Sequence, residues 1–502
     1  MVRIVPIGAI SRRCLSYTRI RLNSSQKSSL DDEKIYFGKF TKAEYDEAAK
    51  YIQNQISKLE SDIKGDVNIR DNLGKMLQFP QRDQKNIQIN NLSDLFTQTI
   101  KTTGPISLSA YMRQCLTHPD LGYYTTRNPL DISLGDFITS PEISSVFGEM
   151  IGIWLYSTWE SQNRPQKIRI IEFGPGKGSL IYDVLNTLNK FAKKSKLDIE
   201  INLIEASSVL RKEQWKLLCG NNEFKDENHG YNSSITKWNN QIRWYNTEKD
   251  IINDEYTTNY VFAHEFFDAL PIKSFQKTEN GWREFLVEHT PSVLNTQGKL
   301  SGEVSKHVEN LETEFHLTLS PKETPSSIIP TLNKNYSNLE VGTRIEICTE
   351  AELYLMKMLQ LVNNKSNTGA VLIIDYGIAD EKPPENSLRG IYKHKIVSPF
   401  FKPGEVDLSI DVDFTALKNL ASKHCKPFGP IDQGDWLHNL GIGYRIKQLI
   451  EKNQNNPEEQ DKIYQAYKRL TSKDENSMGK IYKFFCLMPA NSTPPVGFEQ
   501  LP

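Results

Sequence analysis

"IIEFGPGKGSLIYDVL", residues 170–185, joins an apolar run to a helical pattern through a loop that contains three glycines. The apolar run begins at "KIRIIEF" (167–173), and a short run of this kind before a glycine loop is typical of a buried parallel strand. After the loop, Leu180, Val184 and Leu188 recur at helical spacing. Because glycine has no side chain, a ligand can approach the backbone closely. The stretch therefore predicts a strand–loop–helix unit that binds a cofactor.

The spacing of the glycines separates three classes of cofactor. A P-loop has the pattern GxxxxGK[ST], but here Lys177 lies inside the glycine cluster and no Ser or Thr follows it directly. A dinucleotide-binding G-x-G-x-x-G would need its third glycine at position 179, which is Ser179. The tighter spacing of Gly174, Gly176 and Gly178 favours a nucleoside cofactor without a diphosphate, such as S-adenosylmethionine.

Strand-like and helix-like segments alternate along the rest of the chain. We expect strands at 197–205, 242–246, 259–265, 369–377 and 479–489, and helices at 178–195 and 207–220. This alternation predicts an α/β protein with a doubly wound, mostly parallel sheet. Upstream, the sequence predicts one helix before the Gly-Pro break at 104–105, a second starting near Ser107, and a third capped near Ser140, with Pro141 in its first turn.

The first thirty residues contain six basic side chains, many serines and no acid. This composition is typical of a mitochondrial transit peptide, and a basic disordered tail is the alternative. Without these six, the 61 basic residues fall to 55 against 62 acidic ones, a net charge near −7. That balance gives no support for nucleic-acid binding, which usually requires a basic face.

The remaining composition argues against several kinds of site. No run of 18 apolar residues occurs, so we expect no membrane-spanning helix. The six cysteines lie far apart, with no CxxC pair or Cys/His cluster, which favours free thiols over a zinc site or a disulfide framework.

Acidic residues follow two of the expected strands. Glu205 ends the second strand, where an acid can accept hydrogen bonds from ribose hydroxyls, although a solvated surface acid is the alternative. In "VFAHEFFDALPIKSF" (261–275), Glu265 and Asp268 are three residues apart, so a helical turn would place both on one face. Such a pair can hold a guanidinium bidentately, and an ordinary helix start is the alternative.

Three further aspartates lie in "GEVDLSIDVDF": Asp407, Asp411 and Asp413. Hard cations prefer carboxylate ligands, but this spacing fits no EF-hand. We therefore interpret the segment as a structural turn or wall and expect no metal. Asp375, at the end of the fifth strand, is expected on the acceptor side of the pocket.

Seven motifs occur together and in order over most of residues 93–480: "GPISLSAYMRQCLTHPDLGYY", "GDFITSPEISSVFGE", "EFGPGKGSL", "EFFDALP", "LIIDYG", "RGIYKHK" and "PGEVDLSIDVDF". As a set they resemble the MidA-type mitochondrial methyltransferases. That family includes the protein-arginine methyltransferase that assists assembly of respiratory complex I.

The resemblance implies a Rossmann-like fold, an S-adenosylmethionine cofactor, and symmetric dimethylation of an arginine in a partner protein of the mitochondrial matrix. It implies that the cofactor is bound by Gly174, Gly176, Gly178 and Glu205, and that a loop with Phe137, Thr139, Ser140 and Pro141 closes over it. Glu265 and Asp268 would face the acceptor arginine, with Phe266 and Phe267 as walls. The implied organisation is a transit peptide (1–30), a helical and polar extension (31–90), a methyltransferase domain (91–490) with an insertion near 281–345, and a loose tail (491–502).

One position departs from the family pattern. The residue before the "EFFD" motif is usually asparagine, and here it is His264, whose hydrogen-bonding geometry differs. A non-enzymatic assembly factor of the same fold is therefore the alternative function. An NAD-dependent enzyme is a third candidate.

Overall fold

The computed structural model describes residues 89–126, 139–191, 197–227, 230–252, 254–290, 313–475 and 477–499, together with Lys50 and Asn54. The expected transit peptide, nearly all of the expected extension at 31–90, and Phe137 lie outside the described residues.

A large central sheet organises the chain, with its strands in the order β17-β18-β12-β7-β2-β3-β6-β5-β4. Their bounds in that order are Lys426–Asp432, Tyr482–Met488, Ala370–Ile378, Thr258–His264, Lys167–Phe173, Asp198–Ile204, Gln241–Tyr245, Tyr231–Ile235 and Lys225–Glu227. The five strands from β12 to β6 are parallel, while the strands at both edges are antiparallel. A short strand, β16 (Val412–Asp413), also pairs with β12.

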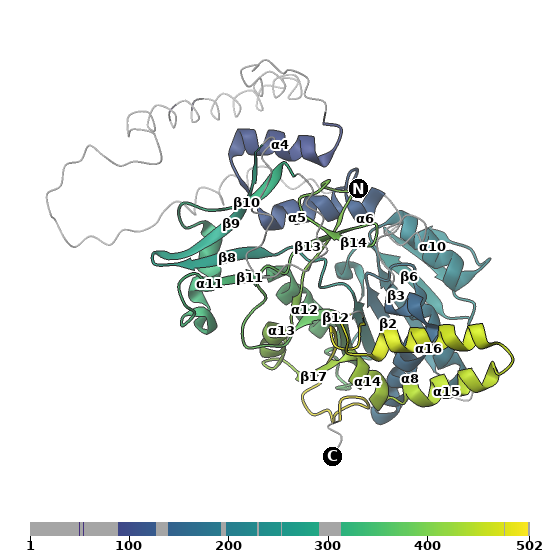
Figure 1. The fold of residues 1–502 in the computed structure, drawn as a ribbon. Helices are drawn as coiled ribbons and strands as arrows, with labels where there is room; N and C mark the ends of the chain where they lie inside the picture. The colour runs from purple at the N-terminus through teal and green to yellow at the C-terminus, as the bar shows by residue number, and fades with distance from the viewer. Residues whose placement is uncertain are drawn as a thin grey trace. The chain divides into compact units, whose positions relative to one another are not determined.

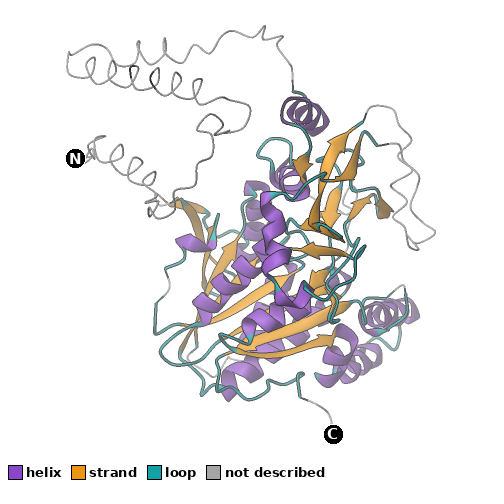
Figure 2. Ribbon diagram, turned by 90° about the vertical axis from the view of Figure 1, so that its left-hand side faces the viewer, coloured by secondary structure: helices purple, strands orange, loops and turns teal. Residues whose placement is uncertain are grey.

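Alternate side chains of the central strands enter two separate cores. Ile170 and Ile374 point to the face covered by α8 (Ser145–Ser161), α9 (Ser179–Phe191), α14 (Gln433–Asn439) and α15 (Ile442–Lys452). Ile171 and Ile373 point to the opposite face, covered by α12 (Thr349–Val362) and α13 (Phe414–Ala421). Figures 1 and 2 show the strands between these two layers of helices. The predicted α/β doubly wound fold is confirmed.

The strand order reverses at β2, which lies between β3 and β7. The chain passes from β2 to β3 on one side and later returns to β7 on the other. Open α/β sheets bind ligands at the carboxyl ends of the strands beside such a reversal. The glycine loop follows β2 directly, so the fold places it at this point.

A five-stranded antiparallel sheet lies beside the central one and contains β1, β8, β9, β10 and β11 (Ile106–Ser107, Lys273–Thr278, Gly281–His289, Phe315–Leu319 and Arg344–Ile347). The described part of the expected insertion, 281–290 and 313–345, supplies β9, β10 and the first half of β11. On one side, Val287 and Phe315 pack with α4 (Leu92–Thr103) and α5 (Leu108–Thr117). On the other side, Phe275 and Trp282 pack with Tyr336.

A small sheet, in the order β14-β13-β15 (Lys395–Val397, Arg389–Tyr392 and Asp407–Ser409), shares the core of α4 and α5. The remaining helices are α6 (Tyr123–Thr126), α7 (Ser140–Ile143), α10 (Ser208–Cys219), α11 (Ile328–Leu332) and α16 (Pro457–Thr471), with short 3-10 turns at Glu248–Asp250, Pro325–Ser327 and Lys334–Tyr336.

The cap expected near Ser140 is Thr139, one residue earlier, which forms a capping box with Glu142, and a second helix, α8, begins after Ser144. One local expectation differs from the structure. The described part of the tail expected to be loose, 491–499, packs against the core, where the Phe498 ring lies 6.3 Å from the Trp436 ring.

Two features of the described residues concern membranes and thiols. None of the described helices is both long enough and apolar enough to cross a membrane. The five cysteines in the described part of the chain are free thiols.

Candidate functional site

The backbone of the glycine loop requires glycine. The φ angles of Gly174, Gly176 and Gly178 are +63°, +55° and +85°, in the left-handed region that other residues rarely adopt. A Cβ atom on Gly174 would lie 3.2 Å from the Phe266 ring. The Gly174 N–H donates to the carbonyl of Ile204 over 3.1 Å, which ties the loop to the end of β3. The loop is thus held open as a bare backbone surface at the edge of the sheet.

Glu205 lies at the carboxyl end of β3, one strand from the loop. Its carboxylate is buried and accepts a hydrogen bond from the Ser207 N–H at 2.7 Å. Burial raises the pKa of Glu205 to about 7, and the hydrogen bond from Ser207 opposes that shift. Its two oxygens can accept further hydrogen bonds, so it fits a ribose with two hydroxyl groups.

Gln214 on α10 connects these two parts, and sequence reasoning missed it. Its side-chain nitrogen donates to the carbonyl of Gly176 over 2.6 Å and lies 3.4 Å from Glu205 Oε2. Its oxygen accepts from Trp244 Nε1 at 2.9 Å, so the fully buried amide is fixed at both ends. The available signal was a polar residue at helical spacing between Leu210 and Leu218, which are both buried.

The helix α7 is attached to the loop by an ion pair. Lys177 Nζ lies 2.9 Å from Glu142 Oε1, and the Thr139 N–H donates to Glu142 Oε2 over 3.3 Å. Thr139 and the first helical residues, Ser140 and Pro141, are thereby placed beside the glycine loop. The Ser140 hydroxyl is fully buried and faces Met478 Sδ at 3.7 Å.

The turn that carries Glu265 and Asp268 is held by one buried carboxylate. Asp375 Oδ2 accepts from three successive backbone N–H groups, those of Phe266, Phe267 and Asp268, at 3.2, 2.9 and 3.3 Å. The Glu265 N–H donates to the carbonyl of Ile374 over 2.9 Å, and Glu265 itself has a φ of +49°. Asp375, expected on the acceptor side, therefore fixes the backbone of the acidic turn.

Tyrosine hydroxyls orient both acids of the turn. Tyr482 Oη donates to Glu265 Oε1 over 3.1 Å, and Tyr376 Oη donates to Asp268 Oδ2. Asp268 Oδ1 is buried and has no hydrogen-bond partner among the described residues. Burial, then the nearby Asp268, raises the pKa of Glu265 to about 8. Burial also raises the pKa of Asp268. The turn thus holds two desolvated carboxyl groups ready for a cationic partner.

His264, the residue before Glu265, is buried beneath this turn. Its Nε2 lies 3.6 Å from Glu265 Oε1 and has no hydrogen-bond partner among the described residues. Its ring is 5.5 Å from the ring of Phe147. Burial lowers the pKa of His264 to about 3, so the imidazole is neutral at pH 7.

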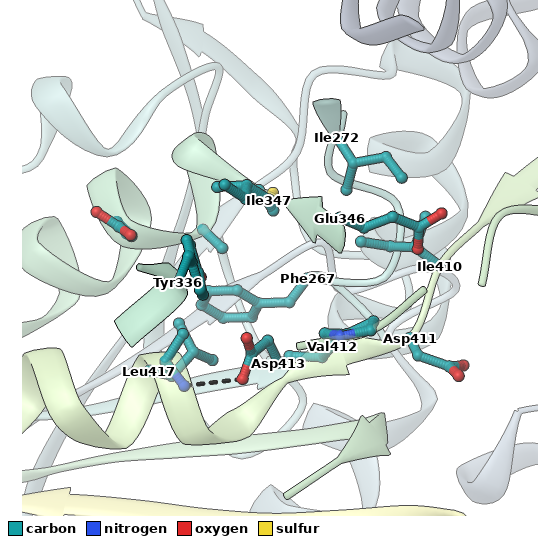
Figure 3. Close-up of a pocket in the computed structure, with 15 residues that line it drawn as sticks. Phe267, Ile272, Tyr336, Glu346, Ile347, Ile410, Asp411, Val412, Asp413 and Leu417 are labelled. Atoms are coloured by element: carbon teal, nitrogen blue, oxygen red, sulfur yellow. Dashed lines mark hydrogen bonds between the residues drawn. The ribbon is translucent and has the colours of Figure 1, made fainter. Parts of the chain in front are cut away.

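The two phenylalanines of the turn have different surroundings. Phe266 lies over Gly174 and contacts the ring of Tyr354 at 5.0 Å. Phe267 is buried and lines a pocket with Tyr336, Glu346 and Ile410, whose lining includes neither Glu265 nor Asp268 (Figure 3).

Two of the three downstream aspartates also line this pocket, and each has a structural partner. Asp413 accepts the backbone N–H of Ala416 at 2.8 Å and caps α13, as the dashed line in Figure 3 marks. Asp411 pairs with Arg389 at 2.8 Å. Among the described residues, no group of three or more His, Cys, Asp or Glu side chains is placed to hold a metal ion.

The chain resembles known proteins in sequence. Residues 150–431 match the family model described as "Putative S-adenosyl-L-methionine-dependent methyltransferase". The mitochondrial protein arginine methyltransferase NDUFAF7 of Xenopus laevis is 34% identical over 413 residues, which are 82% of this chain and 87% of that protein. The human NDUFAF7 is 34% identical over 394 residues, 78% of this chain and 81% of its own length. This chain belongs to the family of S-adenosylmethionine-dependent methyltransferases that includes NDUFAF7.

The fold is also shared with a solved structure. A protein from Burkholderia thailandensis, crystallised with S-adenosyl-homocysteine, superposes with a TM-score of 0.61 at 20% identity over 81% of this chain and 94% of its own. The family and its fold therefore confirm a Rossmann-like methyltransferase whose cofactor is S-adenosylmethionine. The bare glycine loop and the buried Glu205 fit that cofactor, which has an amino-acid part and a ribose but no diphosphate.

Glu172, two residues before Gly174, is expected to make the stability of the fold depend on pH. It is 2% exposed on β2, and its Oε2 has no hydrogen-bond partner among the described residues. Burial raises its pKa to about 8 from the ordinary 4.5. Above pH 4.5 the unfolded chain loses this proton while the folded chain keeps it, so Glu172 lowers stability as the pH rises toward 8, at roughly 1.4 kcal/mol per pH unit.

We expect Glu172→Gln to remove this contribution. Relative to the parent protein, the variant should gain unfolding free energy between pH 5 and 8, by several kcal/mol at roughly 1.4 kcal/mol per unit. Urea denaturation of both proteins across this range measures the difference. Two curves that stay parallel would contradict a buried, protonated Glu172.

Proposed function

We propose that this protein transfers the methyl group of S-adenosylmethionine to a terminal nitrogen of an arginine side chain in another protein. The observation that best supports this proposal is the contact between the glycine loop and the acidic turn. Phe266 of the acidic turn lies over Gly174 of the glycine loop, so the two buried carboxylates are beside the cofactor loop. A cationic acceptor with several N–H donors suits such a pair.

The cofactor would be held by the glycine loop and the end of β3. Gly174, Gly176 and Gly178 would allow its amino-acid part to approach the backbone, and Glu205 would accept from the ribose hydroxyls. Gln214, through its contacts with Gly176 and Glu205, would keep these two parts in register. We also propose that Thr139, Ser140 and Pro141, placed by the Lys177–Glu142 ion pair, line the same site together with Phe137.

Glu265 and Asp268 would bind the guanidinium. S-adenosylmethionine supplies an electrophilic methyl group on a sulfonium. The arginine stays protonated in water because its pKa exceeds about 12, and its charge is delocalised. Two carboxylates on one side of the group would concentrate electron density on the opposite nitrogen. This nitrogen would form a bond to the methyl carbon as the bond between that carbon and sulfur breaks, and S-adenosylhomocysteine would leave. That nitrogen then releases a proton, and a carboxylate of the turn can accept it.

The setting of the reaction is proposed from the relatives and from the N-terminus. The relatives are named mitochondrial, and the basic, acid-free segment 1–30 is typical of a transit peptide. We propose that the protein acts in the mitochondrial matrix, that it dimethylates its arginine symmetrically, and that the target is a subunit needed for assembly of a respiratory complex.

Mass spectrometry of mitochondrial protein from cells with and without this gene product tests the proposal. We expect at least one dimethylated arginine to disappear when the protein is absent and to return when the intact protein is restored. Restoration with Glu265→Gln should not return the mark. An unchanged set of methylated arginines would contradict the proposal and favour a non-enzymatic assembly factor.

A further inference from the structure

Asp407 is held in place by a tyrosine from the N-terminal helices. Tyr124 Oη on α6 lies 2.8 Å from Asp407 Oδ1 and 3.0 Å from Oδ2, so one hydroxyl spans both carboxylate oxygens. Asp407 is the first residue of β15 and is 5% exposed. Burying an acid without a partner is costly. Asp407 is buried and has a fixed orientation, so it differs from an ordinary solvated loop residue.

β15 runs beside the acidic turn. The Ile410 N–H, next to the end of β15, donates to the carbonyl of Asp268 over 3.0 Å. Ser409 Oγ contacts Tyr376 Oη, the hydroxyl that donates to Asp268. Alternate residues of a strand face the same side, so Asp407 shares the face of Ser409 that is directed at the turn.

The charges of this region interact with one another. Burial and the charge of Asp268 are the larger causes that raise the pKa of Glu265, and the charge of Asp407 also raises it. Burial, then Asp407 and Asp268, raises the pKa of Tyr124. Within this group, Asp268 is 8% exposed, and its Oδ1 has no hydrogen-bond partner among the described residues.

Arg389 is the cation among the causes that act on the pKa of Asp268, but it pairs with Asp411 and lies over the Tyr376 ring at 4.8 Å. Asp268 Oδ1 still has no hydrogen-bond partner among the described residues. An unsatisfied buried carboxylate oxygen beside two further acids indicates a place for a cation with N–H donors.

We propose that Asp407, oriented by Tyr124, is a third carboxylate of the acceptor site and selects a cationic guanidinium over a neutral side chain of the same shape. This inference rests on the proposed arginine methyltransferase function. The segment that contains Asp407 is thus more than the structural wall expected from its sequence. Glu265 and Asp268 hold the group for reaction, and Asp407 adds to the negative field that admits it.

Binding of two small probes to the full chain tests this inference. The probes are Nα-acetyl-arginine amide and its neutral analogue Nα-acetyl-citrulline amide, measured by saturation-transfer NMR with S-adenosylhomocysteine present. We expect the parent protein to prefer the arginine probe by at least about tenfold, since a buried charged hydrogen bond contributes roughly 1.5–3 kcal/mol.

Two variants and one control complete the test. Asp407→Asn should reduce this preference about tenfold, and Tyr124→Phe about threefold, since the tyrosine only orients the acid. S-adenosylhomocysteine affinity should not change. Asp198→Asn, at the amino end of β3 on the opposite edge of the sheet, makes the same change of charge and should keep the full preference.

The outcomes separate this inference from the proposed function. A parent protein that binds both probes equally would overturn the proposed function and this inference with it. A parent protein that prefers arginine, with the same preference in Asp407→Asn and Tyr124→Phe, would overturn the role of Asp407 alone. If Asp407→Asn does not fold, the ratio measured for Tyr124→Phe decides the question.

Discussion

Replacing Glu265 by glutamine is expected to lower methyl transfer by roughly a hundred- to a thousand-fold while leaving S-adenosylmethionine affinity nearly unchanged. Glutamine keeps an oxygen that can accept the hydrogen bond from Tyr482, so the turn can retain its geometry. What it removes is the negative charge that Glu265 takes on when a bound guanidinium stabilises its ionised form. Truncating one partner of a buried charge pair costs about 2–5 kcal/mol, or roughly 30- to 5,000-fold, and the expected loss lies within that range.

The measurement is transfer of a labelled methyl group to protein from mitochondria that lack this gene product. Tyr482→Phe removes only the hydrogen bond to Glu265, and we expect it to reduce transfer about fivefold. Glu346→Gln is the matched control because Glu346 is also a buried glutamate, on β11, with its hydrogen bonds to Ser387. It should keep parental activity. Full turnover by Glu265→Gln would remove Glu265 from the reaction.

The strands that carry the fold were predictable because each has a short apolar run or, as in β3, an apolar face. β2 has the bounds that its sequence predicts, and β3, β7 and β12 lie within one residue of theirs. The edge strands β17 and β4, and β5 next to β4, were not predictable. β4 and β5 consist largely of polar residues, and β17 contains two prolines and a glycine, so none shows an apolar pattern. Strands of this kind depend on a neighbour already in place, and prolines are tolerated at sheet edges.

The candidate site also has parts that could be predicted from the sequence and parts that could not. The glycine loop, Glu205 and the acidic turn could be identified because each follows a strand directly, and parallel strands bring their carboxyl ends to one edge. The hydrogen bonds that support them could not be predicted. Asp375 is 107 to 109 positions from the N–H groups it accepts, and Tyr124 is 283 positions from Asp407. Spacing along the chain shows local contacts only, so long-range hydrogen bonds that position a site require the structure.

A second large effect is expected at the glycine loop. Gly174→Val should weaken S-adenosylmethionine binding by at least a hundred-fold, or roughly 2.7 kcal/mol. Two physical causes act together. A residue other than glycine at a φ of +63° costs about 1–2 kcal/mol, and valine is among the least tolerant because of its branched Cβ. The new Cβ would also lie 3.2 Å from Phe266, so the loop or the acidic turn must move.

Gly220→Val is the control that separates the contact with Phe266 from the backbone strain. Gly220 has the same φ of +63°, at the end of α10, but a Cβ there would meet no atom within 4 Å. Both variants carry the backbone strain, while only Gly174→Val disturbs the loop and the turn. Calorimetric titration with S-adenosylmethionine should therefore show near-parental affinity for Gly220→Val and little or no binding for Gly174→Val, with thermal unfolding of both to confirm that they fold. Equal affinities in two folded variants would mean that the cofactor does not approach the backbone at Gly174.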